Sequence, residues 1–257
     1  MSHSQFAPAN PANAPSARFF ASIGITPGMR VLDVGCGNGD LSRTVAALAG
    51  PDGEVIGIDS SEAALTAARA TPADATGAPL RYQFADLSTD LPDLGSFDAI
   101  VGRRVLMYLP DAAATLHRLA RLAKRDTILA FQEHARADLP TGLAALPMHQ
   151  RCYELMWRTI AAEQGDVAIG YRLADLIRGA GFQIDHARCE GVLIQPWHES
   201  FLPMLMRIML PRMIACGAIR ADEIDVDELE RGMDHEGRSG SGTILWDLAF
   251  LVSGRLG

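Results

Sequence analysis

An acidic residue stands just before three closely spaced glycines near the start of the chain, in Val31-Leu32-Asp33-Val34-Gly35-Cys36-Gly37-Asn38-Gly39-Asp40. Apolar residues before this loop predict a buried strand, and the residues after it predict a helix. Glycines at such a turn let backbone N–H groups approach a ligand closely. A nicotinamide or flavin site would show the spacing G-x-G-x-x-G instead. The loop therefore predicts a binding site of another kind.

The charge of Asp33 indicates which ligand the loop suits. A carboxylate in a weakly screened loop repels a diphosphate and attracts an ammonium or sulfonium cation. S-adenosylmethionine carries both of these cations and no phosphate. A tight turn with a structural aspartate is the alternative interpretation of the same residues.

Two further acids follow predicted strands. Asp59 comes twenty residues after Gly39, where a carboxylate in this type of fold accepts hydrogen bonds from ribose hydroxyls. Asp86, after Phe84 and Ala85, supplies an apolar face and one acceptor for an adenine amine. Each acid has a structural alternative, because Asp59 could cap the next helix and Asp86 could open a turn.

The elements that position these residues are predicted from alternating apolar and amphipathic segments, a pattern typical of a parallel sheet. Candidate strands lie at Arg30–Val34, Glu54–Asp59, Arg81–Ala85, Phe97–Val101 and Asp126–Glu133. Two later strands, Phe182–Ile194 and Thr243–Val252, are expected to pair antiparallel at the sheet edge. A helix after the fourth strand is expected to begin at Asp111 as its N-cap, and another is expected near Met148–Gln164.

The predicted fold class is α/β, a doubly wound Rossmann-like seven-stranded sheet whose last strand is antiparallel, with helical cap insertions. The predicted parts are an N-terminal segment with a lid helix (1–28), a core that binds S-adenosylmethionine (29–135), a cap insertion (136–168), a core continuation (169–194), a second cap insertion (195–242) and the last core strand (243–257). In the second cap, Trp197 and several methionines fit three interpretations. The segment could be a lid that covers an apolar acceptor, a dimer interface or plain core. Gly237–Gly242 is expected to be a flexible connection.

Four segments together resemble the class I S-adenosylmethionine-dependent methyltransferases: Val31–Asp40, Ile56–Ser60, Phe84–Leu87 and Phe97–Asp111. The resemblance covers about residues 29–135. Within the family, the sequence is similar above all to the small-molecule enzymes of quinone biosynthesis. It implies S-adenosyl-L-methionine as the cofactor. The cofactor-binding residues that it implies are Asp33 at the methionine end, Gly35, Cys36, Gly37 and Gly39 in the loop, Asp59 and Ser60 at the ribose, and Asp86 and Leu87 at the adenine.

Two segments depart from the family's pattern. Ala123-Lys124-Arg125-Asp126 replaces the usual Pro-Gly-Gly-like turn before the fifth strand. Gly102-Arg103-Arg104-Val105 stands where enzymes that methylate nucleic acid amines have an aromatic-proline tetrad. Arg103 is a candidate to bind a carboxylate of the cofactor or the acceptor, with a solvated arginine as the alternative.

Candidate catalytic residues follow from the chemistry of methyl transfer. A direct in-line displacement needs an aligned acceptor and the exclusion of water, and a base helps when the acceptor is a hydroxyl or a protonated amine. His134 and Glu133 end the fifth predicted strand, at the edge where such sheets bind ligands. His134 is the predicted base, and His149 and Tyr153 are further candidates. The alternatives are a loop histidine bonded to backbone for His134, and a packing or surface role for His149 and Tyr153.

Composition restricts the class of partner. The 257 residues carry a formal net charge of −8, which argues against a surface that tracks nucleic acid phosphates. The four cysteines lie far apart without a pattern typical of metal ligands, and no apolar run is long enough to span a membrane. We therefore expect a cytoplasmic protein with a small-molecule acceptor, no metal, no nucleic acid or membrane partner, and a homodimer left open.

These observations predict an S-adenosylmethionine-dependent methyltransferase, a transferase of small-molecule biosynthesis that methylates an oxygen, nitrogen or carbon atom. The alternatives are a protein that binds S-adenosylmethionine without transferring its methyl group, and an enzyme that catalyses another reaction on the same fold.

Overall fold

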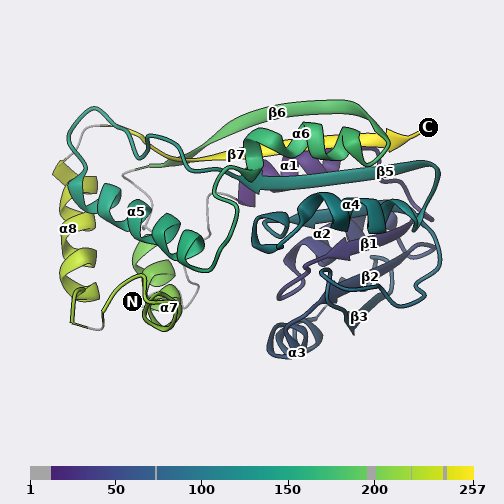
Figure 1. Cartoon of the computed structure of the whole chain (residues 1–257), viewed down its shortest axis with the longest axis horizontal. Helices are drawn as coiled ribbons and strands as arrows, with labels where there is room; N and C mark the ends of the chain where they lie inside the picture. Colours follow the sequence, from purple (N-terminus) through teal and green to yellow (C-terminus); the bar gives the residue numbers. More distant parts are fainter. Residues whose placement is uncertain (1–12, 73, 196–200, 221, 240–241) are drawn as a thin grey trace. The chain divides into compact units, whose positions relative to one another are not determined.

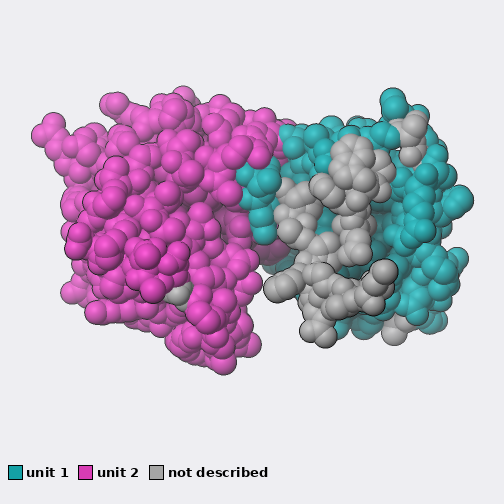
Figure 2. Space-filling view, turned by 180° about the vertical axis from the view of Figure 1, so that it is seen from behind, with its two compact units in different colours: residues 1–15, 136–167, 191–248 teal, residues 16–135, 168–190, 249–257 magenta. Residues whose placement is uncertain are grey.

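The computed structural model describes residues 13–72, 74–195, 201–220, 222–239 and 242–257 (Figure 1). The chain divides into two compact units, which Figure 2 shows in different colours. We call residues 16–135, 168–190 and 249–257 the sheet unit, and residues 1–15, 136–167 and 191–248 the helical unit.

Within the described part of the chain, seven strands form one sheet in the order β3-β2-β1-β4-β5-β7-β6. Strand β1 pairs in parallel with β2 and β4, β2 pairs in parallel with β3, and β4 with β5, whereas β7 runs antiparallel to β5. The predicted fold class is therefore confirmed. The strands are β1 (Arg30–Val34), β2 (Glu54–Asp59), β3 (Leu80–Phe84), β4 (Phe97–Arg103), β5 (Ala123–His134), β6 (Phe182–Ile194) and β7 (Ile244–Leu256).

The inner strands are mostly buried, as expected for strands covered on both faces. Four of the five residues of β1 are buried, and Phe97, Ile100 and Val101 of β4 are fully buried. These strands bring the ends of β1, β2, β4 and β5 to one edge of the sheet, where the candidate site lies.

Strand β5 begins three residues before its predicted start. The pairing of β4 with β5 shifts register between Phe97 and Ala99, and Asp126 adopts a φ of 65°. The Thr127 hydroxyl accepts from the Lys124 N–H and donates to the Phe97 carbonyl at 2.7 Å. The segment that lacks the family's usual turn is thus an irregular first part of the strand.

Helices of the sheet unit cover the strands. Helix α2 packs on β1 and β2, α3 on β2 and β3, and α6 on β5, while α4 and α6 pack against each other. Asp111 caps α4 as predicted, because its side chain accepts from the Ala114 N–H. The helices are α1 (Asn13–Ser22), α2 (Asp40–Ala49), α3 (Glu62–Ala70), the 3-10 helix η1 (Leu106–Tyr108), α4 (Ala112–Ala120) and α6 (Ile169–Gly179).

The helical unit contains α5 (Pro147–Ala162), α7 (Leu202–Ala215) and α8 (Val226–Ser239), which pack on one another. Tyr153 of α5 lies edge-on to Trp246 at 5.5 Å and to Trp157 at 6.1 Å between ring centroids. Helix α8 continues to Ser239, so the expected flexible connection at Gly237–Gly242 is wrong for its first three residues, which are helical. Trp197, assigned above to a lid, interface or core, lies outside the described residues.

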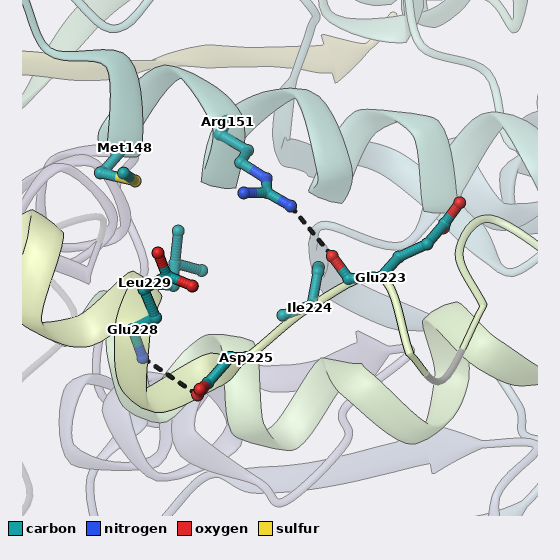
Figure 3. A pocket seen from close by; sticks show the side chains of 7 residues that line it. All are labelled: Met148, Arg151, Glu223, Ile224, Asp225, Glu228 and Leu229. Atoms are coloured by element: carbon teal, nitrogen blue, oxygen red, sulfur yellow. Dashed lines mark hydrogen bonds between the residues drawn. The ribbon is translucent and has the colours of Figure 1, made fainter.

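A small pocket on the helical unit has a volume of about 40 Å³ (Figure 3). Its wall includes the Arg151 guanidinium, which donates to the Glu223 carbonyl at 3.0 Å. The pocket lies within the helical unit. Its lining residues are Met148, Arg151, Glu223, Ile224, Asp225, Glu228 and Leu229.

No helix among the described residues combines the length and the apolar character needed to cross a bilayer.

Gly102 on β4 tests how tightly the sheet is packed. A Cβ atom at this position would lie 2.4 Å from the ring of Phe131, which is fully buried. We expect Gly102→Ala to lower the free energy of unfolding by about 1–3 kcal/mol because the core must shift. Urea unfolding measures the change.

Gly179, the last residue of α6, supplies the matched control, since a Cβ atom there would meet no atom within 4 Å. Gly179→Ala should leave stability unchanged or raise it by up to about 1 kcal/mol. Equal effects of the two substitutions would contradict the packing described for β4.

Candidate functional site

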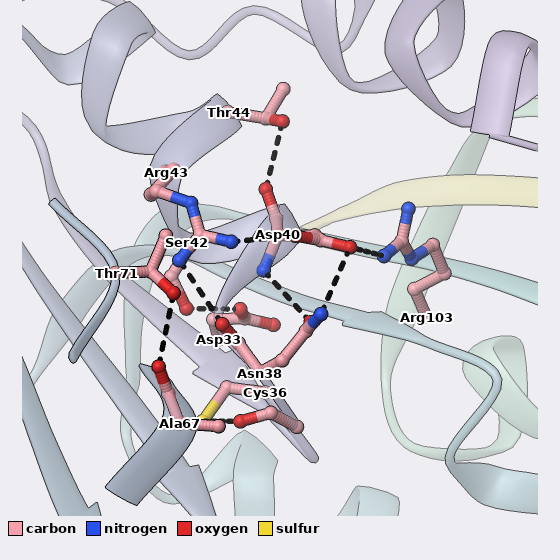
Figure 4. A network of polar contacts seen from close by, with 11 residues as sticks. Asp33, Cys36, Asn38, Asp40, Ser42, Arg43, Thr44, Ala67, Thr71 and Arg103 are labelled. Atoms are coloured by element: carbon pink, nitrogen blue, oxygen red, sulfur yellow. Dashed lines mark hydrogen bonds and ion pairs between the residues drawn. The ribbon is translucent and has the colours of Figure 1, made fainter. Parts of the chain in front are cut away.

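The glycine loop between β1 and α2 is the centre of the candidate site (Figure 4). Gly35, Gly37 and Gly39 have φ values of 64°, 54° and 80°, in the left-handed region that favours glycine. The Cys36 N–H donates to the Ile58 carbonyl of β2 at 3.0 Å. The loop is therefore fixed to the end of the neighbouring strand.

Two of these glycines are needed because protein side chains touch them. A Cβ atom on Gly35 would lie 2.3 Å from the Val105 Cγ2 atom, and one on Gly39 would lie 2.3 Å from the Tyr82 hydroxyl. Gly37 differs, because a Cβ atom there would have no neighbour within 4 Å. The open backbone at Gly37 is the part of the loop that a ligand can approach, which fits an adenosyl cofactor.

Asp59 connects the loop to α3. Its Oδ2 atom accepts from the Gly37 N–H at 2.9 Å, and its Oδ1 atom accepts from the Ser61 N–H at 2.9 Å. Ser61, and not Asp59, is the N-cap of α3, since its side chain accepts from the Ala64 N–H. A carboxylate has about four acceptor positions, so Asp59 keeps capacity for ribose hydroxyls. Ser60, the neighbouring candidate, is exposed.

Asp33 differs from its expected environment. Its side chain is 1% exposed, and its Oδ2 atom accepts from the Ser42 hydroxyl of α2 at 2.5 Å. Burial raises the pKa of Asp33 to about 7, although the Ser42 hydrogen bond and the charge of Arg103 lower it. The sequence predicts that Asp33 acts on a ligand through its charge in the loop. In the structure its carboxyl group is covered by α2, so its cofactor role stays a prediction.

Burial also determines the state of Cys36. Its side chain is 6% exposed, and burial raises the pKa of its thiol, so the sulfur stays protonated at neutral pH. Cys36 thus contributes to the loop through its backbone and its volume.

Arg103, at the end of β4, lies near a carboxylate of the protein itself. Its guanidinium is 3.7 Å from the Asp40 Oδ2 atom, and its side chain is 14% exposed (Figure 4). Asp40 also pairs with Arg43 at 2.5 Å. Burial lowers the pKa of Arg103, while Asp33 and Asp40 raise it. The solvated alternative does not hold, and binding of a ligand carboxylate stays a prediction.

The third expected contact lies just beyond β3. The Asp86 Oδ1 atom accepts from the Ser88 N–H at 2.8 Å, which is the turn given as its structural alternative. Leu87 is buried, and its carbonyl accepts from Thr115 and from Arg118 of α4. Phe84, which pairs with Asp59 in register, is 50% exposed. The exposed ring of Phe84 therefore gives an apolar surface beside Asp59, and the adenine contact stays a prediction.

Glu133 lies at the end of β5 and is fully buried. Its Oε1 atom accepts from the Val105 N–H at 2.9 Å and from the Leu106 N–H at 2.8 Å. Burial raises the pKa of Glu133 to about 7, while these backbone hydrogen bonds lower it. Its carboxylate thus holds the segment after β4.

His134 takes part in a buried chain of polar side chains. The Ser16 hydroxyl donates to the Gln132 Oε1 atom, and the Gln132 Nε2 atom lies 3.3 Å from the His134 Nε2 atom. Since the amide nitrogen can only donate, the His134 Nε2 atom accepts, and a neutral ring carries its proton on Nδ1. His134 thus lies at the end of β5 and not in a loop, and its role as a base stays a prediction.

His149 and Tyr153 lie in the helical unit, whereas Glu133 and His134 lie in the sheet unit. The His149 Nδ1 atom is 2.8 Å from the Glu236 Oε2 atom, and the Tyr153 hydroxyl accepts from the Ala137 N–H at 3.0 Å. Both side chains are buried. Glu236 was missed in the sequence because it is 87 residues from His149 and carries no motif.

Residues 25–178, more than half of the chain, match the family model of a methyltransferase domain. The chain belongs to this family. The predicted family of S-adenosylmethionine-dependent small-molecule methyltransferases is thereby confirmed, and with it the cofactor.

Individual relatives agree with this assignment. Trans-aconitate 2-methyltransferase of Methylobacterium radiotolerans is 33% identical over 174 residues, which are 65% of this chain and 60% of that protein. Ubiquinone biosynthesis O-methyltransferase of Hahella chejuensis is 34% identical over 50% of this chain and 52% of its own length. The chain therefore spans between half and two thirds of the length of these relatives.

A solved structure has the same fold. The YcgJ protein of Bacillus subtilis matches with a TM-score of 0.59 and 15% identity, over 95% of this chain and 98% of that one. At this identity the likeness concerns the fold alone.

Asp33 generates a prediction about pH. Because burial raises its pKa from 3.8 to about 7, the folded state binds the proton more tightly, so Asp33 contributes stability at low pH that is lost as pH rises from about 4 to 7. Asp33→Asn removes this dependence, and relative to wild type the variant should gain a few kcal/mol between about pH 4.5 and pH 8.

Urea unfolding of both proteins at the two pH values checks this, and the comparison cancels the contribution of Glu133. A variant that loses the same stability at both pH values would show that Asp33 has an ordinary pKa.

Proposed function

We propose that this chain transfers the methyl group of S-adenosylmethionine to an oxygen, nitrogen or carbon atom of a small-molecule acceptor. The observation that carries the proposal is the open backbone at Gly37, held by the carboxylate of Asp59 at the ligand edge of the sheet. The cofactor supplies an electrophilic methyl group on a sulfonium that leaves as a neutral thioether.

The residues assigned to the cofactor all lie in the sheet unit. Gly35, Gly37 and Gly39 shape the loop, and Asp59 accepts from the ribose. Asp86 and Leu87 border the adenine beside the exposed ring of Phe84. Arg103 neutralises a carboxylate at the methionine end, where Asp40 is its partner within the protein.

The part of the protein in the chemical step is alignment and exclusion of water. His134 is the candidate base, and its Nε2 lone pair is held by Gln132 in this structure. Proton removal by this atom requires that hydrogen bond to open. His149 and Tyr153 are buried, so their direct contact with an acceptor requires the helical unit to open.

The names of the relatives suggest which acceptors to try first. One acts on trans-aconitate, and others act in ubiquinone biosynthesis or on 2-phytyl-1,4-naphthoquinone. We propose a carboxylic acid or a quinone precursor as the acceptor class. A transfer assay with labelled methyl groups against both classes separates them.

One fold neighbour is a [4+2]-cyclase, with a TM-score of 0.50 and 19% identity, so the fold by itself permits a reaction other than methyl transfer. Cofactor binding without transfer to any tested acceptor would favour that alternative or a protein that only binds the cofactor. A cytoplasmic location, a homodimer and the lack of a nucleic acid partner stay predictions.

Asp59 supplies the test of the cofactor site. We expect Asp59→Ala to weaken binding of S-adenosylhomocysteine at least about tenfold, because the ribose loses an ionised acceptor worth about 1.5–3 kcal/mol. Isothermal titration measures the affinity. Asp90→Ala, at an exposed acid of the same unit, should bind as wild type does. Unchanged affinity in Asp59→Ala would remove the ribose contact assigned to Asp59.

His134 supplies the test of the base. If this imidazole removes a proton, His134→Ala should lower kcat by about 10²-fold or more and abolish the fall in activity at acidic pH. Gln132→Leu frees the His134 Nε2 atom and should keep that pH dependence. Full activity of His134→Ala with an unchanged pH profile would eliminate the role.

A further inference from the structure

We propose that Glu133 is a positioning residue of the cofactor site: it holds the segment after β4 so that Val105 supports Gly35 of the glycine loop. The inference rests on the proposed function, because it assigns the loop to the cofactor. It replaces the catalytic role predicted for Glu133 with one exerted through neighbouring residues.

The first step is the pair of hydrogen bonds between Glu133 and the backbone after β4. Its Oε1 atom accepts the Val105 and Leu106 N–H groups at 2.9 and 2.8 Å. Val105 is the N-cap of η1 and provides no side-chain cap of its own. A carboxyl group from another strand therefore satisfies the N–H groups that begin this helix.

The second step is a strained turn just before the residues that Glu133 binds. Arg104 has a φ of 56°, which residues other than glycine rarely adopt. Its N–H donates to the Gln132 carbonyl at 2.8 Å, next to Glu133 on β5. Backbone in such a conformation persists only when its surroundings hold it. The end of β5 holds it on both sides, through Gln132 and Glu133.

The third step is the contact with the loop. A Cβ atom on Gly35 would lie 2.3 Å from Cγ2 and 2.7 Å from Cβ of Val105, so the Val105 side chain rests directly on the Gly35 backbone. Gly35 precedes Gly37 by two residues, and Gly37 is the open backbone of the loop. A shift of Val105 therefore changes the loop that receives the cofactor.

The burial of Glu133 agrees with positioning. Its side chain is 0% exposed, and one of its oxygens is engaged by two backbone N–H groups. A general base must reach the proton it removes, directly or through one water. Glu133 acts instead on the backbone that lines the loop.

The experiment compares substitutions that remove or keep the hydrogen bonds to the Val105 and Leu106 N–H groups. Glu133→Ala should raise the Kd for S-adenosylhomocysteine about tenfold, whereas Glu133→Gln should stay within about threefold of wild type, because the amide oxygen accepts the same N–H groups. Val105→Ala should also raise the Kd. The double variant Glu133→Ala/Val105→Ala should bind no more weakly than the weaker single variant, because both act through one contact.

Leu129→Ala is the control for lost stability. Leu129 lies on the same strand and is fully buried, so its truncation should lower Tm without changing the Kd. If Glu133→Ala does not fold, Val105→Ala and Glu133→Gln carry the test, and a Val105→Ala variant that binds as wild type overturns the proposal.

Other outcomes also decide. Wild-type affinity of Glu133→Ala, or an equal loss in Leu129→Ala, overturns the inference, and so does a collapse of kcat in Glu133→Gln at unchanged cofactor affinity, which would show a catalytic role. If Asp59→Ala alone weakens binding, the proposed function stands and only this inference fails. If wild type does not bind S-adenosylhomocysteine, both fail.

Discussion

The hydrogen bond from the Gly37 N–H to the Asp59 carboxylate joins the glycine loop to the end of β2. The same carboxylate accepts the Ser61 N–H before α3, so one side chain connects the glycine loop, the end of β2 and the start of α3. Its formation requires the left-handed backbone of the loop, and this requires glycine. Val105 and Tyr82 then fill the space beside Gly35 and Gly39, which leaves Gly37 as the open position.

Among the described residues, two further acids accept two backbone N–H groups of another element. Glu133 accepts from Val105 and Leu106 at η1, and Glu236 accepts from Met148 and His149 at the start of α5. In each case the acid and the N–H groups that it binds belong to different elements. N–H groups at the start of a helix carry a partial positive charge, which favours an acid there. The structure thus uses buried or half-buried acids to join elements, and this explains why acids at strand ends cannot all be taken as ligand contacts.

Local sequence pattern was sufficient for most of the sheet. The bounds of β1, β2 and β6 agree with the predicted strands, and buried apolar residues mark β1 and β2 clearly. The start of β5 was missed, since its irregular pairing depends on Thr127 bonding to a neighbouring strand. The wall formed by Tyr82 and the link from Glu133 to Gly35 are contacts between distant segments, and the covering of Asp33 by Ser42 depends on how α2 packs on β1. A single sequence carries no signal for them.

The helical unit is built from separate stretches of chain. Residues 136–167 and 191–248 leave and re-enter the sheet unit, and β7 has its first residues in one unit and the remainder in the other. No continuous fragment therefore contains the helical unit alone. Cutting the chain at the boundary after residue 248 would divide β7, which pairs with β5. Exchanging this unit between homologous proteins would require grafting its separate segments together, with junctions that preserve the register of an inner strand.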